Sequence, residues 1–213
     1  IGSLLFLTTS FLVLAGVWAT PFLIDLIAPG FVGEKRSLTI EIVQILFPGT
    51  GFLVLSAWCL GILNSHKKFF ISYVAPVVWN LSIIGVLIYY GPQLAQGDLA
   101  IKTAWGLVLG SFLQFIIQLP MVVRLGGKLF PSLAMRATGV PVVLKNFVPV
   151  VFSRGVVQVS AYIDNILASL LPTGAVSAIA YAQTLYLLPV SLFGMSVSAA
   201  ELPQMSQAMG SPE

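Results

Sequence analysis

Two charged side chains, Arg154 and Asp164, lie in an apolar stretch at residues 145–174 that is long enough to cross a bilayer. A charge at such depth costs roughly 2.5–3.5 kcal/mol on insertion scales, so it normally faces a protein interior or a hydrated cavity. The sequence therefore offers two interpretations of this stretch. Its charges form a static network with a neighbouring helix, or they line a path for a polar substrate.

The polar residues of this stretch share one helical face. At 100° per residue, one stripe contains Arg154, Gln158, Ala161, Asn165 and Ser169, with Asp164 on its edge. The two charges are ten residues apart, about 15 Å along a helix axis, so they cannot neutralise each other directly. We therefore predict a helix with one polar face and an otherwise apolar surface.

The composition excludes an ordinary soluble domain. Of 213 residues, 58% are hydrophobic and 8% are charged, against roughly 25% charged in soluble domains. The mean hydropathy is +1.00, which predicts a polytopic membrane protein. No basic tract with interleaved aromatic residues is present, so we expect no nucleic-acid partner. The chain begins at Ile1 and ends at Glu213 without a closing element, and we expect it to be a fragment of a longer chain.

The sequence shows no pattern of a catalytic or metal site. Cys59 and His66 are each the sole residue of their type, so neither a disulfide framework nor a thiolate or histidine metal site is expected. A membrane enzyme such as a prenyl transferase would need clustered carboxylates to hold magnesium and diphosphate. The aspartates that lie in or beside apolar segments, Asp25, Asp98 and Asp164, lack Asp-x-x-Asp spacing. We therefore expect no enzyme activity and no cofactor.

Six segments have the length that a helix needs to cross about 30 Å of hydrocarbon. They are residues 3–27, 38–63, 69–90, 99–123, 145–174 and 176–200. The fold class predicted is all-α, a polytopic bundle of transmembrane helices. Ser37 is the expected N-cap of the second helix. Residues 124–140 are the least apolar part and the expected linker between helical bundles.

Internal polar residues and prolines mark most of these helices. Gln114 and Gln118, one turn apart, are expected to form interhelical hydrogen bonds. The prolines within helices include Pro48, Pro76 and Pro120. Interrupted helices are typical of transporters, although a static bundle of kinked helices would show the same pattern.

Basic residues are unevenly distributed between alternate loops. One side holds six, Lys67, Lys68, Arg124, Lys128, Arg136 and Lys145, and the other holds three, Lys35, Arg36 and Lys102. Because lysine and arginine accumulate in cytoplasmic loops, we predict that the hairpin at residues 64–68 and the linker are cytoplasmic.

Several short strings occur in order along the chain: residues 27–31 (IAPGF), residues 61–64 (GILN), Ala75-Pro76 with Asn80, residues 118–120 (QLP), residues 164–171, Tyr181-Ala182 and Leu188-Pro189. Taken together, they resemble the MurJ/MviN lipid II flippase family of the multidrug/oligosaccharidyl-lipid/polysaccharide exporter superfamily. The resemblance implies a bacterial inner-membrane protein that flips lipid II, a peptidoglycan precursor carried on undecaprenyl diphosphate. It also implies a fold of about fourteen helices in two pseudo-symmetric lobes around a central cavity.

On this resemblance the chain would contain parts of both lobes. Residues 1–124 would be four helices that complete the first lobe, residues 125–140 the cytoplasmic linker, and residues 141–213 the first two helices of the second lobe. The expected partners are the undecaprenyl-diphosphate-linked substrate, membrane lipids and the remaining helices of the parent chain.

The resemblance also suggests cavity residues. Gln183 and Thr184 occupy positions where familiar members carry an Asp-Arg pair, so a cation is missing there. Arg154 is the only deep cation in this chain, and its guanidinium suits phosphate oxygens. The candidates that line the cavity are Arg154, Gln158, Asp164, Asn165, Gln183 and Thr184. The altered pair leaves open the export of another polyprenyl-linked glycan or an amphiphilic drug, and a static charge network would favour a non-transporting membrane scaffold.

Overall fold

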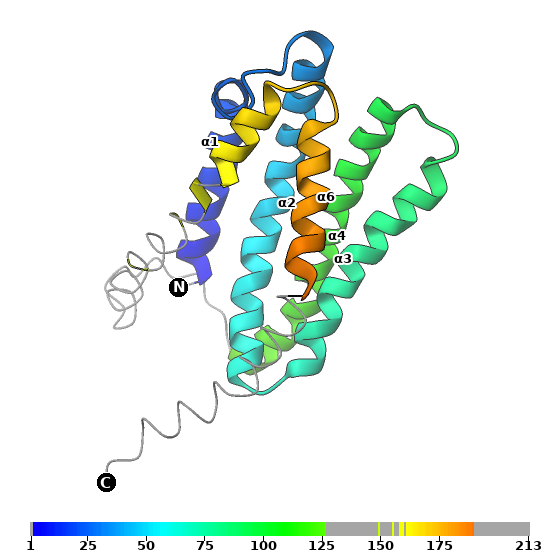
Figure 1. The fold of residues 1–213 in the computed structure, drawn as a ribbon. Helices are drawn as coiled ribbons and strands as arrows, with labels where there is room; N and C mark the ends of the chain where they lie inside the picture. Colours follow the sequence, from blue (N-terminus) through cyan, green and yellow to red (C-terminus); the bar gives the residue numbers. More distant parts are fainter. Residues whose placement is uncertain (1, 127–148, 150–154, 156–157, 160, 190–213) are drawn as a thin grey trace.

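The computed structural model describes residues 2–126, 149, 155, 158–159 and 161–189, and every regular element within them is a helix. The labelled helices are α1 (Gly2–Ile27), α2 (Gly33–Ser65), α3 (Phe69–Tyr90), α4 (Gln96–Gly126) and α6 (Ala175–Pro189), shown in Figure 1. Residues 161–169 form a further helical stretch before α6. The all-α prediction is confirmed.

Four of the helices, α1 to α4, are long and apolar enough to cross a membrane. They correspond to the first four predicted spans, and α3 has the predicted bounds. The last two predicted spans extend beyond the described residues. The described part of α6 has 15 residues, fewer than the roughly 20 that a span requires.

Helix α2 begins earlier than predicted, and the proposed N-cap at Ser37 is wrong. Ser37 lies inside α2, where its hydroxyl donates to the Glu34 carbonyl at 2.9 Å. The helix starts after Val32, which makes no side-chain cap bond. Gly33 has a positive φ of 58°, a conformation that glycine adopts without steric cost. The chain can therefore turn directly from the α1–α2 loop into the helix.

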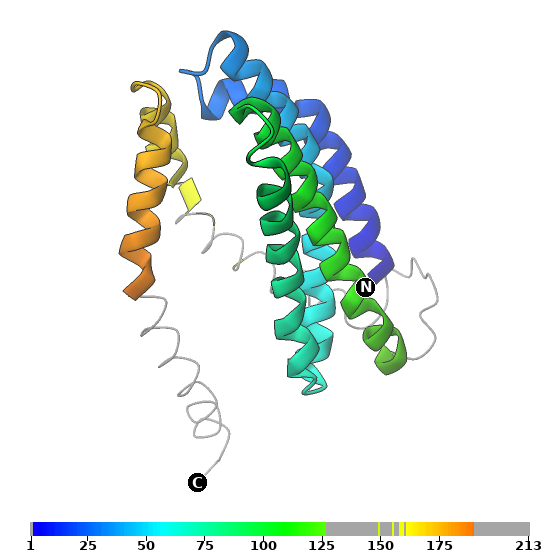
Figure 2. The same ribbon diagram turned by 90° about the vertical axis from the view of Figure 1, so that its right-hand side faces the viewer.

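The first four helices pack as one bundle, in which α4 lies along both α2 and α3 while α1 lies along α2 (Figures 1 and 2). Glycines permit two of these contacts. A Cβ on Gly110 of α4 would lie 2.9 Å from the Trp79 carbonyl oxygen of α3. A Cβ on Gly16 of α1 would overlap the ring of Phe47 in α2. Small residues allow this close approach of helix backbones in membrane proteins.

Helix α1 contains Pro21, and its backbone defect is repaired by α2. Proline has no N–H, so the carbonyl four residues earlier, that of Val17, loses its helical donor. The Gln44 side-chain amide of α2 donates to this carbonyl at 3.2 Å. An unpaired carbonyl is costly in hydrocarbon, so Gln44 both joins the two helices and makes the proline tolerable.

A buried chain of hydrogen bonds joins α2 and α4. The Gln114 amide donates to the Ser56 hydroxyl at 2.8 Å, and that hydroxyl donates to the Gln118 carbonyl oxygen at 3.1 Å. Ser56 and Gln118 are each 1% exposed. The predicted interhelical role of the two glutamines is confirmed, and Ser56 is their partner.

Candidate substrate path

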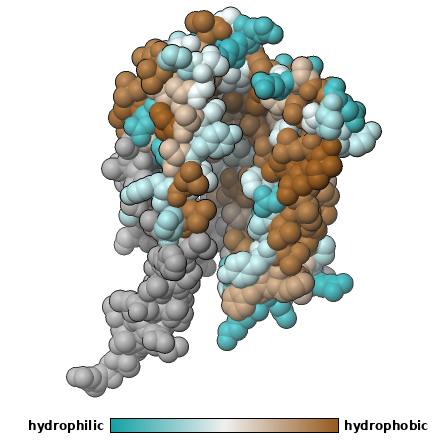
Figure 3. All heavy atoms as spheres, turned by 45° about the vertical axis from the view of Figure 1, so that its right-hand side comes forward, coloured by the Kyte–Doolittle hydropathy of each residue, from teal (hydrophilic) through white to brown (hydrophobic). Residues whose placement is uncertain are grey.

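The helical stretch 161–169 and α6 form a second group beside the four-helix bundle. A turn at residues 170–174 joins them. Among the labelled helices, α6 packs against none of the other four. Figure 2 shows the second group standing apart from the bundle along most of its length. The space-filling view in Figure 3 shows a hollow between the column of α6 and the bundle.

The two groups meet where the α1–α2 loop reaches the end of the stretch 161–169. The Gly30 N–H donates to the Ser169 hydroxyl at 3.3 Å, and that hydroxyl donates to the Ile166 carbonyl at 2.7 Å. Ser169 is buried. A Cβ on Gly30 would overlap the Ser169 carbonyl oxygen, so only glycine fits at this contact.

Three of the sequence-predicted candidates lie along the helical residues before this contact. Gln158, Asp164 and Asn165 are all exposed. The Asn165 amide donates to the Ala161 carbonyl one turn back, at 2.9 Å. Asp164 has no ion-pair partner among the described residues. These side chains therefore present polar groups on an exposed helix. The remaining candidate of this helix, Arg154, lies outside the described residues.

The other two candidates are on α6. Gln183 and Thr184 are exposed, and the Thr184 hydroxyl donates to the Ala180 carbonyl at 2.9 Å. Within the described part of the chain, no hydrogen bond links either residue to the polar side chains of residues 158–165. The structure therefore places five candidates on two helical segments, and among the described residues no hydrogen bond joins the candidates of one segment to those of the other.

The contact between Gly30 and Ser169 is not among those predicted from the sequence. Ser169 belongs to the polar stripe, and Gly30 lies in the string at residues 27–31 that carries part of the resemblance. Their pairing joins residues 139 positions apart. No local pattern in the sequence specifies such a contact.

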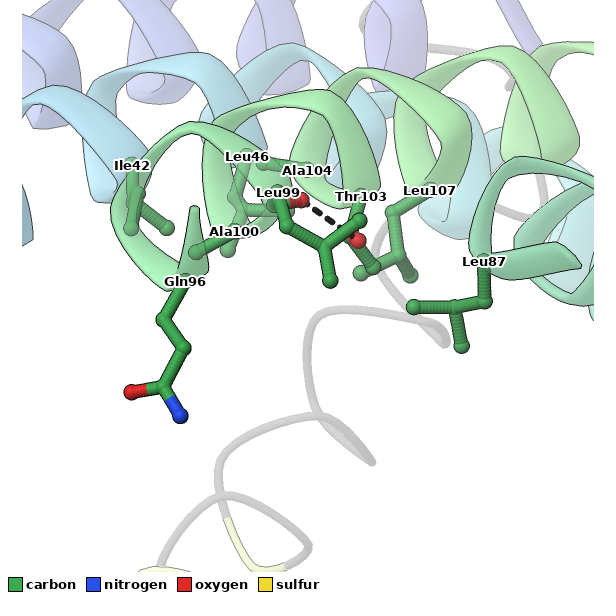
Figure 4. A pocket seen from close by; sticks show the side chains of 9 residues that line it. All are labelled: Ile42, Leu46, Leu87, Gln96, Leu99, Ala100, Thr103, Ala104 and Leu107. Atoms are coloured by element: carbon green, nitrogen blue, oxygen red, sulfur yellow. Dashed lines mark hydrogen bonds between the residues drawn. The ribbon is translucent and has the colours of Figure 1, made fainter. Parts of the chain in front are cut away.

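One pocket of the bundle has a different chemistry. It has a volume of about 350 Å³ and is lined by Ile42, Leu46, Leu87, Gln96, Leu99, Ala100, Thr103, Ala104 and Leu107 (Figure 4). The Thr103 hydroxyl is engaged with the Leu99 carbonyl at 2.7 Å, and the Gln96 amide points away from the apolar lining (Figure 4). The lining holds no cation, so this pocket suits apolar chains rather than an anionic headgroup.

The described residues also contain no group of three or more His, Cys, Asp or Glu side chains that could hold a metal ion. What they define is a multi-pass helical membrane protein, in which two helical groups touch at one end and flank a hollow.

Comparison with known proteins gives the family. The family model described as "Lipid II flippase MurJ" matches residues 1–213. The chain belongs to this family.

The chain is 36% identical to the lipid II flippase MurJ of Burkholderia cenocepacia over 83% of this chain and 34% of the relative. It is 33% identical to the probable lipid II flippase MurJ of Haemophilus influenzae over 82% of this chain and 33% of the relative. The probable lipid II flippase MurJ of Buchnera aphidicola subsp. Schizaphis graminum is 31% identical over 92% of this chain and 38% of the relative. The chain thus spans about a third of the length of the curated relatives it matches.

Proposed function

We propose that this chain is part of a flippase that moves lipid II across the bacterial inner membrane. The family match over the whole chain carries this proposal. A flippase does no covalent chemistry on its substrate, so the proposed role is transport and not catalysis. Its partners would be the undecaprenyl-diphosphate-linked substrate, the surrounding membrane lipids and further helices of the parent protein.

The physical requirements of flipping agree with the arrangement of the two helical groups. A diphosphate headgroup must cross a low-dielectric slab while its polyprenyl tail stays in lipid. Such an anion needs hydration and fixed cations, since an unpaired charge in hydrocarbon is prohibitively costly. The hollow beside α6 and the exposed polar residues Gln158, Asp164, Asn165, Gln183 and Thr184 are suited to a hydrated path.

We further propose that the two helical groups belong to different lobes of the transporter. Residues 1–124 would complete the first lobe, residues 125–140 would link the lobes on the cytoplasmic side, and residues 141–213 would begin the second lobe. The contact between Gly30 and Ser169 would then join the lobes at the non-cytoplasmic surface. The bundle and the second group diverge from that contact (Figure 2), which would open the path toward the cytoplasm.

A second candidate substrate follows from α6. Gln183 and Thr184 can hydrogen-bond but carry no charge. They would therefore stabilise a bound diphosphate less than a cationic side chain at the same positions. An amphiphilic drug, or a glycan carried on a polyprenyl monophosphate, would make a smaller electrostatic demand on these positions than a diphosphate.

Transport by the full-length protein in lipid vesicles tests the proposal. Fluorescent lipid II, a polyprenyl-linked glycan without the peptide, and an amphiphilic dye would each be supplied, and translocation measured by quenching from outside. We expect lipid II to move fastest. Faster movement of the glycan or the dye would show that this compound, and not lipid II, is the preferred substrate. Movement of none of the three would favour a non-transporting scaffold. The 213-residue chain alone is the control, and it should show only background movement because it lacks the helices that complete the cavity.

A further inference from the structure

We propose that the α2–α3 hairpin end of the bundle binds the phosphate headgroups of anionic phospholipids. Three exposed cations lie at this end: Lys67 and Lys68 in the hairpin, and Arg124 in the last turn of α4. A buried cluster of Cys59, Leu63 and Val122 holds the ends of α2 and α4 together. The three cations are therefore presented on one end of a packed unit.

The backbone at the hairpin is unusual for a lysine. Lys67 has a φ of 58°, and it is the only described non-glycine residue with a positive φ. Its N–H donates to the Asn64 carbonyl at 3.0 Å, and the Lys68 N–H donates to the Leu63 carbonyl at 2.8 Å. This hydrogen-bond pair is the Schellman motif, whose left-handed position is usually glycine. Any Cβ there crowds a carbonyl oxygen. The chain thus places a long cation where its backbone favours glycine.

Cations at the two ends of the bundle differ in their partners. At the far end, Arg36 forms a two-pronged ion pair with Asp25 at 2.7 and 2.9 Å. Lys35 lies 3.9 Å from the centre of the Phe31 ring, and Lys102 lies 5.9 Å from that of Tyr90.

At the hairpin end, none of the three cations has an ion pair or aromatic-ring partner among the described residues. Their charges are therefore available to a ligand outside the bundle.

Exposed aromatic side chains near the lysines suit a position of the hairpin at the membrane surface. Phe69 and Phe70 directly follow the lysines, Tyr73 lies one turn further on, and the three are 50%, 80% and 69% exposed. Tyrosine is one of the two residue types that gather at the level of the lipid headgroups, so Tyr73 favours this level for the start of α3. Ammonium and guanidinium groups at that level can donate hydrogen bonds to phosphodiester oxygens. A phospholipid leaflet is the anionic partner that a hairpin beside membrane-spanning helices meets directly, and this inference does not depend on the transported substrate.

Lipid retention by the purified full-length protein tests the proposal. Native mass spectrometry would count bound phosphatidylglycerol and phosphatidylcholine in the wild type and in the double variant Lys67→Gly, Lys68→Gln. We expect the wild type to favour phosphatidylglycerol. Each lysine near an anionic lipid strengthens binding roughly fivefold, so the double variant should lose roughly 25-fold in retention. Lys102→Gln, an exposed cation at the opposite end, is the matched control and should retain lipid normally.

Thermal unfolding separates lost binding from lost fold. Glycine suits the backbone at residue 67, so Lys67→Gly alone should unfold at the wild-type temperature or above it and still lose retention. In the wild type, raising salt from 0.1 M to 1 M shortens the Debye length from about 10 to about 3 Å and should strip the bound lipid. Unchanged retention in the double variant, an equal loss in Lys102→Gln, or retention that persists in 1 M salt would each overturn the proposal.

Discussion

The Gln44 side-chain amide donates to the carbonyl of Val17, the carbonyl that Pro21 deprives of its helical donor. One interhelical bond thus compensates for one missing bond inside a helix. The α1–α2 interface and the proline in α1 are therefore energetically coupled, and this coupling can be measured.

We predict that Gln44→Leu destabilises the full-length protein in a way that depends on Pro21. Interhelical hydrogen bonds in membrane proteins contribute about 0.6 kcal/mol on average and up to about 1.7 kcal/mol. The variant should lose this amount in thermal or denaturant unfolding. In a Pro21→Ala background the new N–H can serve Val17, so the same substitution should cost much less. Equal costs in both backgrounds would show that the Val17 carbonyl has no need of Gln44.

A second prediction compares two buried serines. Ser56 joins Gln114 and Gln118 across the α2–α4 interface, whereas Ser72 of α3 donates to the carbonyl of Lys68, the residue just before its own helix, at 3.2 Å. Ser56→Ala leaves an amide and a carbonyl unpaired, so it should destabilise the protein by about 1–3 kcal/mol. Ser72→Ala, at a site that is 0% exposed, should cost distinctly less. Unfolding in detergent measures both. Equal losses of stability in Ser56→Ala and Ser72→Ala would contradict the proposed importance of the Ser56 hydrogen bonds.

A third prediction concerns the contact between the helical groups. Gly30→Ala adds a methyl group where the Ser169 carbonyl oxygen already lies, so the loop and the helix end should move apart. Spin labels on Lys35 and Leu171 should report a longer distance in the full-length protein by pulsed electron resonance. Transport should also fall if this contact closes one side of the path.

Two controls accompany this experiment. Ser169→Ala removes the hydroxyl and leaves the space, and Gly61→Ala adds a methyl group where no atom lies within 4 Å. Both should keep the wild-type distance. A wild-type distance in Gly30→Ala would mean that the contact adjusts without separation.

The fourth prediction concerns Arg154, the candidate that the sequence supplies for the diphosphate. Loss of a charge-assisted contact costs on the order of 1.5–3 kcal/mol, which is about tenfold to more than a hundredfold in affinity. Arg154→Ala in the full-length protein should therefore abolish complementation of a flippase-depleted strain at normal membrane levels. Arg154→Lys should rescue it partly, because an ammonium keeps the charge without the guanidinium fork.

Full complementation by Arg154→Ala would move the phosphate contact to another part of the protein. Disappearance of the variant from the membrane would instead assign Arg154 to a folding network, as in the static interpretation of residues 145–174.

Hydropathy predicted the helices well where the apolar run and the helix coincide. Helix α3 has its predicted bounds because polar or flexible residues, Lys68 and Gly91, flank its apolar run. Helix α2 was predicted five residues too short at its start because residues 33–37 are polar and helical. Hydropathy detects the part of a helix that lies in lipid and not the part that extends beyond it.

Tertiary partners were beyond the reach of local patterns. The spacing of Gln114 and Gln118 indicated interhelical bonds, but Ser56 as their partner depends on how α2 and α4 align. The same holds for Gln44, whose acceptor exists only because a proline lies in a different helix. The six cavity candidates from the sequence stay predictions, since their roles depend on substrate contacts.

The unequal lengths of two neighbouring helices indicate which part of the longer helix extends out of the hydrocarbon layer. Helix α2 has 33 residues and α3 has 22, which correspond to about 50 and 33 Å of helix. Both helices leave the same hairpin, so α2 reaches about 17 Å past the end of α3 and beyond the roughly 30 Å hydrocarbon layer. We therefore expect the contact between Gly30 and Ser169, at the far end of α2, to lie among headgroups and water. If this contact opens during transport, water can hydrate the freed N–H and hydroxyl, so the opening would expose no polar group to hydrocarbon.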